Sequence, residues 1–369
     1  MATSGSSPPP YMQAAQLCQF NDAYQLNTVL TPSLRDNEIL VKIHAAGFCH
    51  SDLQVIQGEF SSKLPIVPSH EPAGIIVQKG SACDSTFQVG DRVGVLNFKN
   101  ACGGCTGCRL AKSRNEPCQQ TALDPRWCDH REMAGFKHDG AFAEYMVADP
   151  STTVRLPDEL AFEQAAPLMC AGATVWGALE KATAGLLPGD TVAIVGIGGL
   201  GHLGVQFAKA LGFRTIAIDS REAGRRLASD VPSEALNPDL IVDSLAPDAT
   251  QEIFKFTDGE GIAAAVVCTD SLPANEWAPS LLRIQGTLVL LGLPREKWRF
   301  DASAIVFKEL MLRGSYVTSR ESTERMMEVV EKHGIRSFLT VVEFHDVAKV
   351  VDMYKDKTFS GRIVVKIAS

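Results

Sequence analysis

Four cysteines lie within the segment CGGCTGCRLAKSRNEPC, residues 102–118. Cys102, Cys105 and Cys108 stand at three-residue steps, and nine residues separate the third cysteine from Cys118. Four thiolates suit the tetrahedral coordination of a structural zinc ion, and the glycines between them let the chain turn around one ion. An iron–sulfur cluster also uses four cysteines, and a C-x-x-C pair can act as a redox couple. Three equal steps exceed what one dithiol needs, so the spacing favours a structural metal site.

A second group of candidate ligands is spread over three motifs, GFCHSD, PSHEPAG and PLMCAG. These motifs contain Cys49, His70 and Cys170, together with Asp52 and Glu71. A catalytic zinc ion takes three protein ligands and keeps one position open, and two cysteines with one histidine would provide that set. Each residue also has a plainer interpretation, because a cysteine on an apolar helix is more often a small core residue and a histidine between prolines can belong to a loop. Spacing alone leaves both interpretations open.

A glycine-rich turn follows in TVAIVGIGGLG, where Gly196, Gly198 and Gly201 form a G-x-G-x-x-G pattern between a strand-like run and a helical pattern. Such glycines let the backbone approach a pyrophosphate, and the N–H groups of the following helix stabilise its charge. Asp219, at the end of the next apolar run, can accept hydrogen bonds from the adenosine ribose and would repel a 2′-phosphate. The pattern favours NAD over NADP, although the nearby Arg221 can accommodate a phosphate. The alternative is that the glycines serve only close helix–strand packing.

The elements that must position these residues change character along the chain. Short alternating apolar runs extend to about residue 147 and predict an irregular, mostly antiparallel β domain. From about residue 162, strand-like and helix-length segments alternate, which predicts a parallel sheet covered by helices. AAPLMCAGATVWGALEKA has a helical pattern, and GRIVVKI near the end is typical of a strand that rejoins the first domain. We therefore expect an α/β protein with a disordered tail at 1–14, a catalytic β domain at 15–162, a Rossmann NAD-binding domain at 163–315 and a return segment of the catalytic domain at 316–369.

Length, charge and cysteine use limit the function. The 369 residues exceed what one hydrophobic core normally supports, which predicts two domains. A net charge of −8 argues against nucleic acid or an anionic membrane surface as the main partner, so a small-molecule substrate fits better. No apolar run approaches the roughly 18 residues of a membrane span, and MATSGSSPPP lacks the features of a signal peptide. We expect a cytoplasmic protein, in which ten cysteines serve as ligands or core residues rather than as disulfides.

Six motifs together resemble the zinc-containing medium-chain alcohol dehydrogenases, particularly their fungal and bacterial tetrameric branch. In chain order they are GFCHSDLQ, SHEPAG, CGGCTGC, HDGAFAEY, APLMCAGATVWGAL and GIGGLGHLGVQFAKALG. The resemblance implies a chaperonin-10-like β domain plus a Rossmann doubly wound parallel sheet. It also implies one catalytic and one structural Zn²⁺ per chain, NAD(H) as the cofactor, and a homo-oligomer, either tetramer or dimer. GTLVLLG and the apolar run before Ser315 are candidates for a subunit interface or equally for the core.

The resemblance implies roles for the scattered ligands. Cys49, His70 and Cys170 would bind the catalytic zinc, which lowers the pKa of an alcohol so that hydride can pass to the nicotinamide. Asp52 would orient His70, and Glu71 would lie close to the metal.

The same resemblance assigns residues to the substrate and the cofactor. Ser51 would hydrogen-bond the substrate oxygen, and His50 and Arg362 would lie near the cofactor pyrophosphate. The other predicted cofactor-binding residues are Gly196, Gly198, Gly199, Leu200, Gly201, Asp219 and Arg225.

The chain departs from the family pattern after the third cysteine of the segment. The spacer before Cys118 is longer than in relatives, so we expect Cys118 as the fourth structural ligand, with Cys128 as the substitute. The stretch from Cys118 to His138 is also longer. Because long loops often carry function, Trp127 or Arg126 either reaches the substrate entrance or lies on a solvated surface.

The predicted substrate pocket contains Phe60 and Asn97 where yeast-type fermentative enzymes have two tryptophans. This smaller, more polar wall predicts better turnover of larger or aromatic alcohols and aldehydes than of ethanol. We therefore expect zinc-dependent, NAD(H)-linked interconversion of alcohols and aldehydes or ketones. Two alternatives stay open: a dedicated reductase or dehydrogenase of a secondary-metabolite pathway, and a non-catalytic NAD-binding protein, against which the intact ligand set counts.

Overall fold

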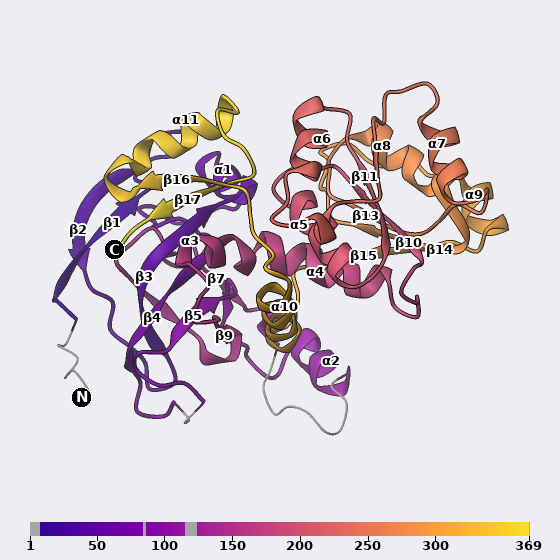
Figure 1. Cartoon of the computed structure of the whole chain (residues 1–369). Coiled ribbons are helices and arrows are strands. Elements are labelled where there is room, and N and C mark those ends of the chain that lie inside the picture. Colours follow the sequence, from indigo (N-terminus) through magenta and orange to yellow (C-terminus); the bar gives the residue numbers. More distant parts are fainter. Residues whose placement is uncertain (1–7, 84–85, 115–123, 369) are drawn as a thin grey trace. The chain divides into compact units, whose positions relative to one another are not determined.

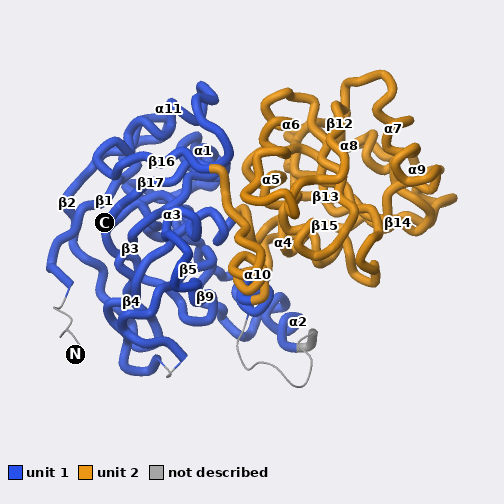
Figure 2. The backbone as a smooth tube through the Cα atoms, viewed as in Figure 1, with its two compact units in different colours: residues 1–170, 319–324, 339–369 blue, residues 171–318, 325–338 orange. Residues whose placement is uncertain are grey.

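The computed structural model describes residues 8–83, 86–114 and 124–368 of the chain. The chain divides into two compact units, shown in blue and orange in Figure 2. Unit 1 comprises residues 1–170, 319–324 and 339–369, and unit 2 comprises residues 171–318 and 325–338. The domain boundaries expected at 162/163 and 315/316 stay predictions.

Unit 1 is built around a mostly antiparallel sheet, as the short alternating runs predicted (Figure 1). Within the described residues the strand order is β16-β17-β3-β4-β5-β9, with β8 paired to β3. These strands are β3 (Ile39–Phe48), β4 (Pro72–Lys79), β5 (Arg92–Val95), β8 (Tyr145–Ala148), β9 (Thr153–Arg155), β16 (Leu339–Glu343) and β17 (Arg362–Lys366). Because β17 pairs antiparallel with β3, the prediction that the last strand rejoins the first domain is confirmed.

Smaller elements of unit 1 surround this sheet. Two short antiparallel pairs are β1 (Tyr11–Gln16) with β2 (Gln25–Leu30) and β6 (Phe98–Lys99) with β7 (Glu132–Met133). The helices are α1 (His50–Ile56), α2 (Thr106–Arg114), α3 (Phe162–Ala165) and α11 (Val350–Lys355), with 3-10 turns η1 (Pro125–Trp127), η2 (Pro150–Thr152), η3 (Ala166–Met169) and η6 (Phe344–Lys349). Helix α10 (Arg320–His333) begins in unit 1 and continues in unit 2. Large side chains such as Ile43, Phe48 and Phe142 are buried in the core.

Unit 2 contains a parallel sheet whose strand order, in the described residues, is β12-β11-β10-β13-β14-β15. Numbered along the chain, this is the order 3-2-1-4-5-6 of the doubly wound dinucleotide-binding fold. The strands are β10 (Thr191–Val195), β11 (Arg214–Ile218), β12 (Leu240–Val242), β13 (Ile262–Val267), β14 (Leu282–Leu290) and β15 (Met311–Gly314). The helices are α4 (Ala171–Ala182), α5 (Gly201–Ala210), α6 (Glu222–Ser229), α7 (Ala249–Phe256), α8 (Leu272–Trp277) and α9 (Ala302–Phe307), with turns η4 (Glu234–Leu236) and η5 (Ala278–Leu281).

The central strands of unit 2 explain why this sheet is parallel and enclosed. All residues of β10 and β13 are buried, and both strands consist mainly of Val, Ile and Ala, which is the composition of strands covered on both faces.

The glycine turn follows β10 directly. Gly196 has φ +90°, and a Cβ atom there would lie 2.8 Å from Thr269. A Cβ atom on Gly201 would lie 2.1 Å from the Gly196 carbonyl oxygen, so the turn closes more tightly than other residues permit.

The helical pattern of AAPLMCAGATVWGALEKA is interrupted in the structure. Turn η3 ends before Cys170, whose backbone (φ −123°, ψ −72°) is not helical, and α4 begins at the next residue. The interruption places Cys170 at a corner of the chain.

The segment GTLVLLG forms part of β14, which is paired on both sides by β13 and β15 and therefore belongs to the core of the sheet.

Candidate active site and metal centres

The first turn of α1 holds several predicted site residues within four positions. Asp52 is buried, and its Oδ2 accepts a hydrogen bond from the backbone N–H of Cys49 at 2.8 Å. This contact closes the helix start in the manner of a capping box. His50 and Ser51 occupy the first two helical positions and are exposed and partly exposed, respectively. The local pattern CHSD thus turns a sulfur and a carboxylate into the interior while its middle residues face outward.

The loop that carries His70 is held by the HDGAF motif. Ser69, just before the histidine, has φ +76°, and its backbone N–H donates to Asp52 Oδ1 at 3.1 Å. The backbone N–H of Ala141 donates to the Ser69 carbonyl at 2.9 Å. A Cβ atom on Gly140 would lie 2.0 Å from the same carbonyl oxygen. The glycine of the motif therefore allows the two loops to meet and fixes the backbone beside His70.

Cys49, His70 and Cys170 meet in the interior of unit 1. The distance from His70 Nε2 to Cys170 Sγ is 3.3 Å, and the two sulfur atoms lie 4.0 Å apart. The other ring nitrogen, His70 Nδ1, lies 3.4 Å from Asp52 Oδ1, an arrangement that orients a metal-binding imidazole. A carboxylate oxygen of Glu71 completes a set of four atoms within 4.8 Å of one another. The structure thus brings together all three predicted catalytic ligands.

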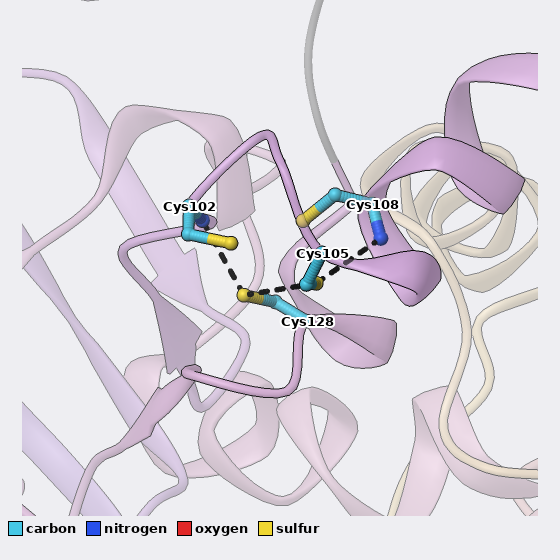
Figure 3. Close-up of side chains that lie close together, drawn as sticks. All are labelled: Cys102, Cys105, Cys108 and Cys128. Carbon is cyan, nitrogen blue, oxygen red and sulfur yellow. Dashed lines mark hydrogen bonds between the residues drawn. The ribbon is translucent and has the colours of Figure 1, made fainter.

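Four cysteines also converge in the metal lobe, but the fourth is Cys128 (Figure 3). Its Sγ lies 3.9 Å from that of Cys105, close to the about 3.8 Å that separates sulfurs around a tetrahedral zinc ion with bonds of about 2.3 Å. Backbone N–H groups of Cys102 and His130 donate to the Cys128 sulfur. None of the described cysteines forms a disulfide. Cys118, the residue preferred from the sequence, lies outside the described residues.

Hydrogen bonding favours the thiolate form of two of the four cysteines, Cys102 and Cys105. The backbone N–H groups of Gly104 and Cys105 lower the pKa of Cys102 to about 6. The backbone N–H groups of Asp129 and Cys108 lower the pKa of Cys105, whereas burial raises the pKa of Cys108 to about 12. A bound divalent cation favours the thiolate form of all four, because it replaces the proton on each sulfur.

The glycine turn in unit 2 is joined to the acidic residue expected to hold the ribose. Asp219 is buried, and its Oδ2 accepts a hydrogen bond from the backbone N–H of Ile197 at 2.7 Å. A Cβ atom on Gly224 in α6 would lie 2.3 Å from the same oxygen, so this glycine makes room for the carboxylate. Arg225 Nη1 donates to the Asp219 carbonyl and lies 3.1 Å from Asp243 Oδ2.

Comparison with known protein families and relatives identifies the family of this chain. Residues 35–158 match the alcohol dehydrogenase GroES-like domain, and residues 199–332 match the zinc-binding dehydrogenase domain. The chain is 35% identical over 358 residues to an alcohol dehydrogenase of Geobacillus stearothermophilus, covering 96% of this chain and all of that relative. The chain belongs to the zinc-containing medium-chain alcohol dehydrogenase family. It is also 30% identical to alcohol dehydrogenase 1 of Emericella nidulans, with 97% and 99% of the two chains covered.

Structural comparison agrees. The crystal structure of the alcohol dehydrogenase from Aeropyrum pernix matches with a TM-score of 0.81 at 28% identity, covering 96% of this chain and 100% of that chain. The expected fold class, a chaperonin-10-like β domain plus a Rossmann sheet, is thereby confirmed. As an alcohol dehydrogenase of this family, the protein is a zinc-dependent, NAD(H)-linked oxidoreductase that interconverts alcohols with aldehydes or ketones. Among the described helices, none combines the length and hydropathy needed to cross a membrane.

Glu71 and Arg362 of this alcohol dehydrogenase form a buried pair beside the two thiols and the imidazole. Arg362 Nη2 binds Glu71 Oε1, and both side chains are almost fully buried. Burial raises the pKa of Glu71 to about 7, although the guanidinium opposes the shift. Glu71 Oε2 is buried with no hydrogen-bond partner among the described residues, and a Cβ atom on Gly47 would lie 2.0 Å from it. An unpartnered carboxylate oxygen next to two thiols and an imidazole fits a divalent cation.

The two thiols of this cluster, Cys49 and Cys170, differ in acidity. The hydrogen bond from Cys170 holds the pKa of Cys49 well below its ordinary value, although burial opposes the shift. The same hydrogen bond raises the pKa of Cys170, and burial adds to that effect. Cys49 is therefore the thiol that is deprotonated first, and a cation bound by both sulfurs would displace the proton held by Cys170.

An aromatic wall lies over the imidazole of His70. The ring of Phe136 lies 5.0 Å from the His70 ring, and Phe60 packs edge-on against Phe136 at 4.9 Å. The predicted pocket residue Phe60 is thus one ring away from the cluster. Asn97 is partly buried, and its backbone carbonyl accepts a hydrogen bond from Ala134, two residues before Phe136.

Phe136 was missed by the sequence reasoning, although it belongs to the longer stretch whose function was left open. Arg126 is instead buried against Asp124 within the metal lobe, and its guanidinium lies 5.2 Å from the ring centroid of the half-exposed Trp127. The only sequence signal for Phe136 was its position two residues before the HDGAF motif. The roles expected for Ser51 and His50 stay predictions.

Proposed function

We propose that Cys49, His70 and Cys170 hold the catalytic zinc of this alcohol dehydrogenase and leave its fourth position open to the substrate oxygen. The observation that carries the proposal is the convergence of the two sulfurs and His70 Nε2 in a buried cluster. Zinc supplies a Lewis acid that polarises the substrate oxygen while the nicotinamide exchanges a hydride with the carbon.

The remaining residues of the site position these groups. Asp52 keeps the His70 ring turned toward the thiols, because its carboxylate faces the other ring nitrogen. Glu71 supplies negative charge beside the cation and is balanced by Arg362. Ser51, partly exposed at the start of α1, is our candidate for holding the substrate hydroxyl proton. His50 and Arg362 remain our candidates for the cofactor pyrophosphate.

We also infer that the structural zinc is held by Cys102, Cys105, Cys108 and Cys128. The four sulfur positions and the N–H donors directed at them support this assignment. In unit 2, the buried Asp219 supports a preference for NAD over NADP, since a carboxylate hydrogen-bonds ribose hydroxyls and repels a 2′-phosphate. The glycine turn with Gly198, Gly199 and Leu200 supports binding of the pyrophosphate at the start of α5.

The substrates we propose are larger or aromatic primary alcohols and the corresponding aldehydes. Two phenylalanines that pack edge to face, Phe60 and Phe136, support an apolar, aromatic environment over the metal ligand His70. Edge-to-face packing favours an aromatic ring over a two-carbon substrate, because it adds specific contacts to the burial of apolar area.

A thiol substitution with a matched control tests this function. Cys170→Ser should remove one of the two zinc ions per chain and lower kcat/KM for benzyl alcohol by about 10³-fold or more, because several kcal/mol of charge stabilisation are lost. Cys18→Ser changes an exposed thiol elsewhere in unit 1 and should leave both quantities unchanged. Metal content by plasma mass spectrometry and NADH formation at 340 nm are the readouts. Full activity of Cys170→Ser, or a larger kcat/KM for ethanol than for benzyl alcohol, would refute the corresponding part of the proposal.

We further propose that the chain is a cytoplasmic homo-oligomer. The described cysteines are all free thiols, which supports a reducing compartment. Strand β15 ends the sheet of unit 2, and its Met311 is exposed. Ile284 and Phe307, in the neighbouring strand and helix, are also exposed. An open strand edge beside apolar side chains supports pairing with a second copy of the chain.

A further inference from the structure

The carboxylate of Asp219 is not free to receive a ribose in this structure. Besides the N–H of Ile197, it binds the backbone N–H of Arg221 at 2.8 Å and the guanidinium of the same residue. Arg221 Nε lies 3.0 Å from Asp219 Oδ1, and Nη2 lies 2.7 Å from Oδ2. The arginine therefore occupies both oxygens of the residue that a dinucleotide-binding turn uses to select its ribose.

The Arg221 side chain also folds back over the glycine turn. Its Nη2 donates to the carbonyl oxygen of Ile197 at 3.2 Å, and a Cβ atom on Gly198 would lie 3.8 Å from the same nitrogen. The side chain of Arg221 is 62% exposed, whereas that of Asp219 is only 3% exposed. The pair consequently presents its cation to the solvent and hides its anion.

This arrangement changes the electrostatics of the ribose site. A buried carboxylate alone repels a 2′-phosphate, but a carboxylate paired with an outward-facing guanidinium has no net charge. Arginine binds phosphate in a planar, two-pronged geometry, and Arg221 Nη1 makes no hydrogen bond to the described residues. We propose that Arg221 is a specificity-determining residue that lets this site bind NADP(H) as well as NAD(H).

The two cofactors use the pair differently. With NAD, the ribose hydroxyls take the oxygens of Asp219, and the exposed guanidinium turns into the solvent. With NADP, the guanidinium stays beside Asp219 and binds the 2′-phosphate, so the buried carboxylate never faces it alone. The preference for NAD is therefore narrow. This inference rests on the proposed function in one respect, that the glycine turn binds a dinucleotide, and is independent of the alcohol substrate.

Calorimetric titration of the zinc-loaded enzyme with NAD and with NADP tests the inference without any catalytic step. In the unmodified protein, the Kd for NADP should lie within about tenfold of that for NAD. Arg221→Ala should weaken NADP by about tenfold or more, equivalent to about 1.4 kcal/mol, and change NAD by less than about threefold. Arg221→Lys should restore part of the NADP affinity, because it keeps the charge without the planar geometry.

Arg226→Ala is the matched control, because this arginine lies on α6, the helix that begins just after Arg221, and is bound to Glu222 instead. It should move neither affinity. Equal weakening of both cofactors by Arg221→Ala, or unchanged NADP binding, would overturn the role of Arg221. Binding of NAD alone by the unmodified protein would also overturn it while leaving the proposed function intact. Failure of both dinucleotides to bind would instead overturn the dinucleotide site itself.

Discussion

At the residue scale, function depends on which atoms each side chain faces. His70 presents one ring nitrogen to two thiols and the other to Asp52. Asp219 lies where the glycine pattern expects it, but Arg221 covers it. The neighbouring residues therefore decide what each of these groups does. Substitutions that change few atoms, such as cysteine to serine, are the sharpest tests.

Cys128 and Cys118 are distinguished by serine substitutions. Cys128→Ser should remove the structural zinc, because three thiolates no longer close the tetrahedral shell. Metal content should fall from about two ions to about one per chain, with a lower Tm, whereas Cys118→Ser should change neither quantity. The contrary result, zinc lost only with Cys118→Ser, would make Cys128 a bystander.

His138 makes stability depend on pH. Its Nδ1 lies 2.8 Å from the Asp139 carbonyl, and its Nε2 is buried without a hydrogen-bond partner among the described residues. Burial, aided by Lys99, lowers its pKa to about 3. A folded pKa below the unfolded value near 6.5 favours the neutral native form, so this stability is complete above about pH 6.5 and is lost as the pH falls toward 3.

Between pH 7 and pH 5, His138 becomes protonated in the unfolded chain but stays neutral in the folded chain. This difference should lower the free energy of unfolding by about 2 kcal/mol. Urea unfolding of the wild type and of His138→Asn at both pH values measures this change in unfolding free energy. Zinc loss and the other histidines affect both proteins alike, so they cancel in the comparison. The wild type should lose more stability than the variant. Parallel losses would show that His138 titrates normally in the folded chain.

At the scale of elements, close approaches of backbone carry the sites. The break between η3 and α4 lets the Cys170 side chain reach Cys49 and His70. The HDGAF loop supports the backbone before His70. In the metal lobe, α2 meets η1 where Gly107 faces the carbonyl of Trp127. Gly107 precedes Cys108 and Trp127 precedes Cys128, so this contact brings two ligands together.

Gly107→Ala should therefore separate the two halves of the lobe. Its Cβ atom would lie 1.6 Å from the Trp127 carbonyl oxygen, a clash with backbone that a side-chain rotation does not relieve. We expect a loss of about 1–3 kcal/mol of stability and faster release of zinc to a chelator. Gly104→Ala is the control, because a Cβ atom there meets nothing within 4 Å. Equal zinc release from the two variants would contradict the role assigned to this contact.

At the scale of the whole molecule, assembly depends on the edge of the unit 2 sheet. Met311→Glu places a charge on the exposed edge strand β15, which should block pairing with a second copy. Light scattering after size-exclusion chromatography should show an oligomer for the wild type and a smaller species for the variant. Leu245→Glu changes a residue that is more exposed than Met311 and lies beyond the opposite edge strand, so it should keep the wild-type mass. An oligomer unaffected by Met311→Glu would place the interface elsewhere.

The sequence by itself determined the fold class and the chemistry. Local signals suffice for the glycine turn and the cysteine lobe, because each acts over a few residues. The catalytic ligands were assigned through the resemblance of six motifs. The alternation of strands and helices likewise predicted the parallel sheet of unit 2, and GRIVVKI predicted the return of β17 to unit 1.

Only the tertiary structure decided which distant residues share a site. Cys128 joins the lobe, Phe136 covers His70, Arg221 covers Asp219, and Glu71 pairs with a residue 291 positions away, Arg362. The last of these contacts shows the physical reason most clearly. Contacts across such separations depend on how loops and units close in three dimensions, and no periodicity in the chain records where a buried charge finds its partner.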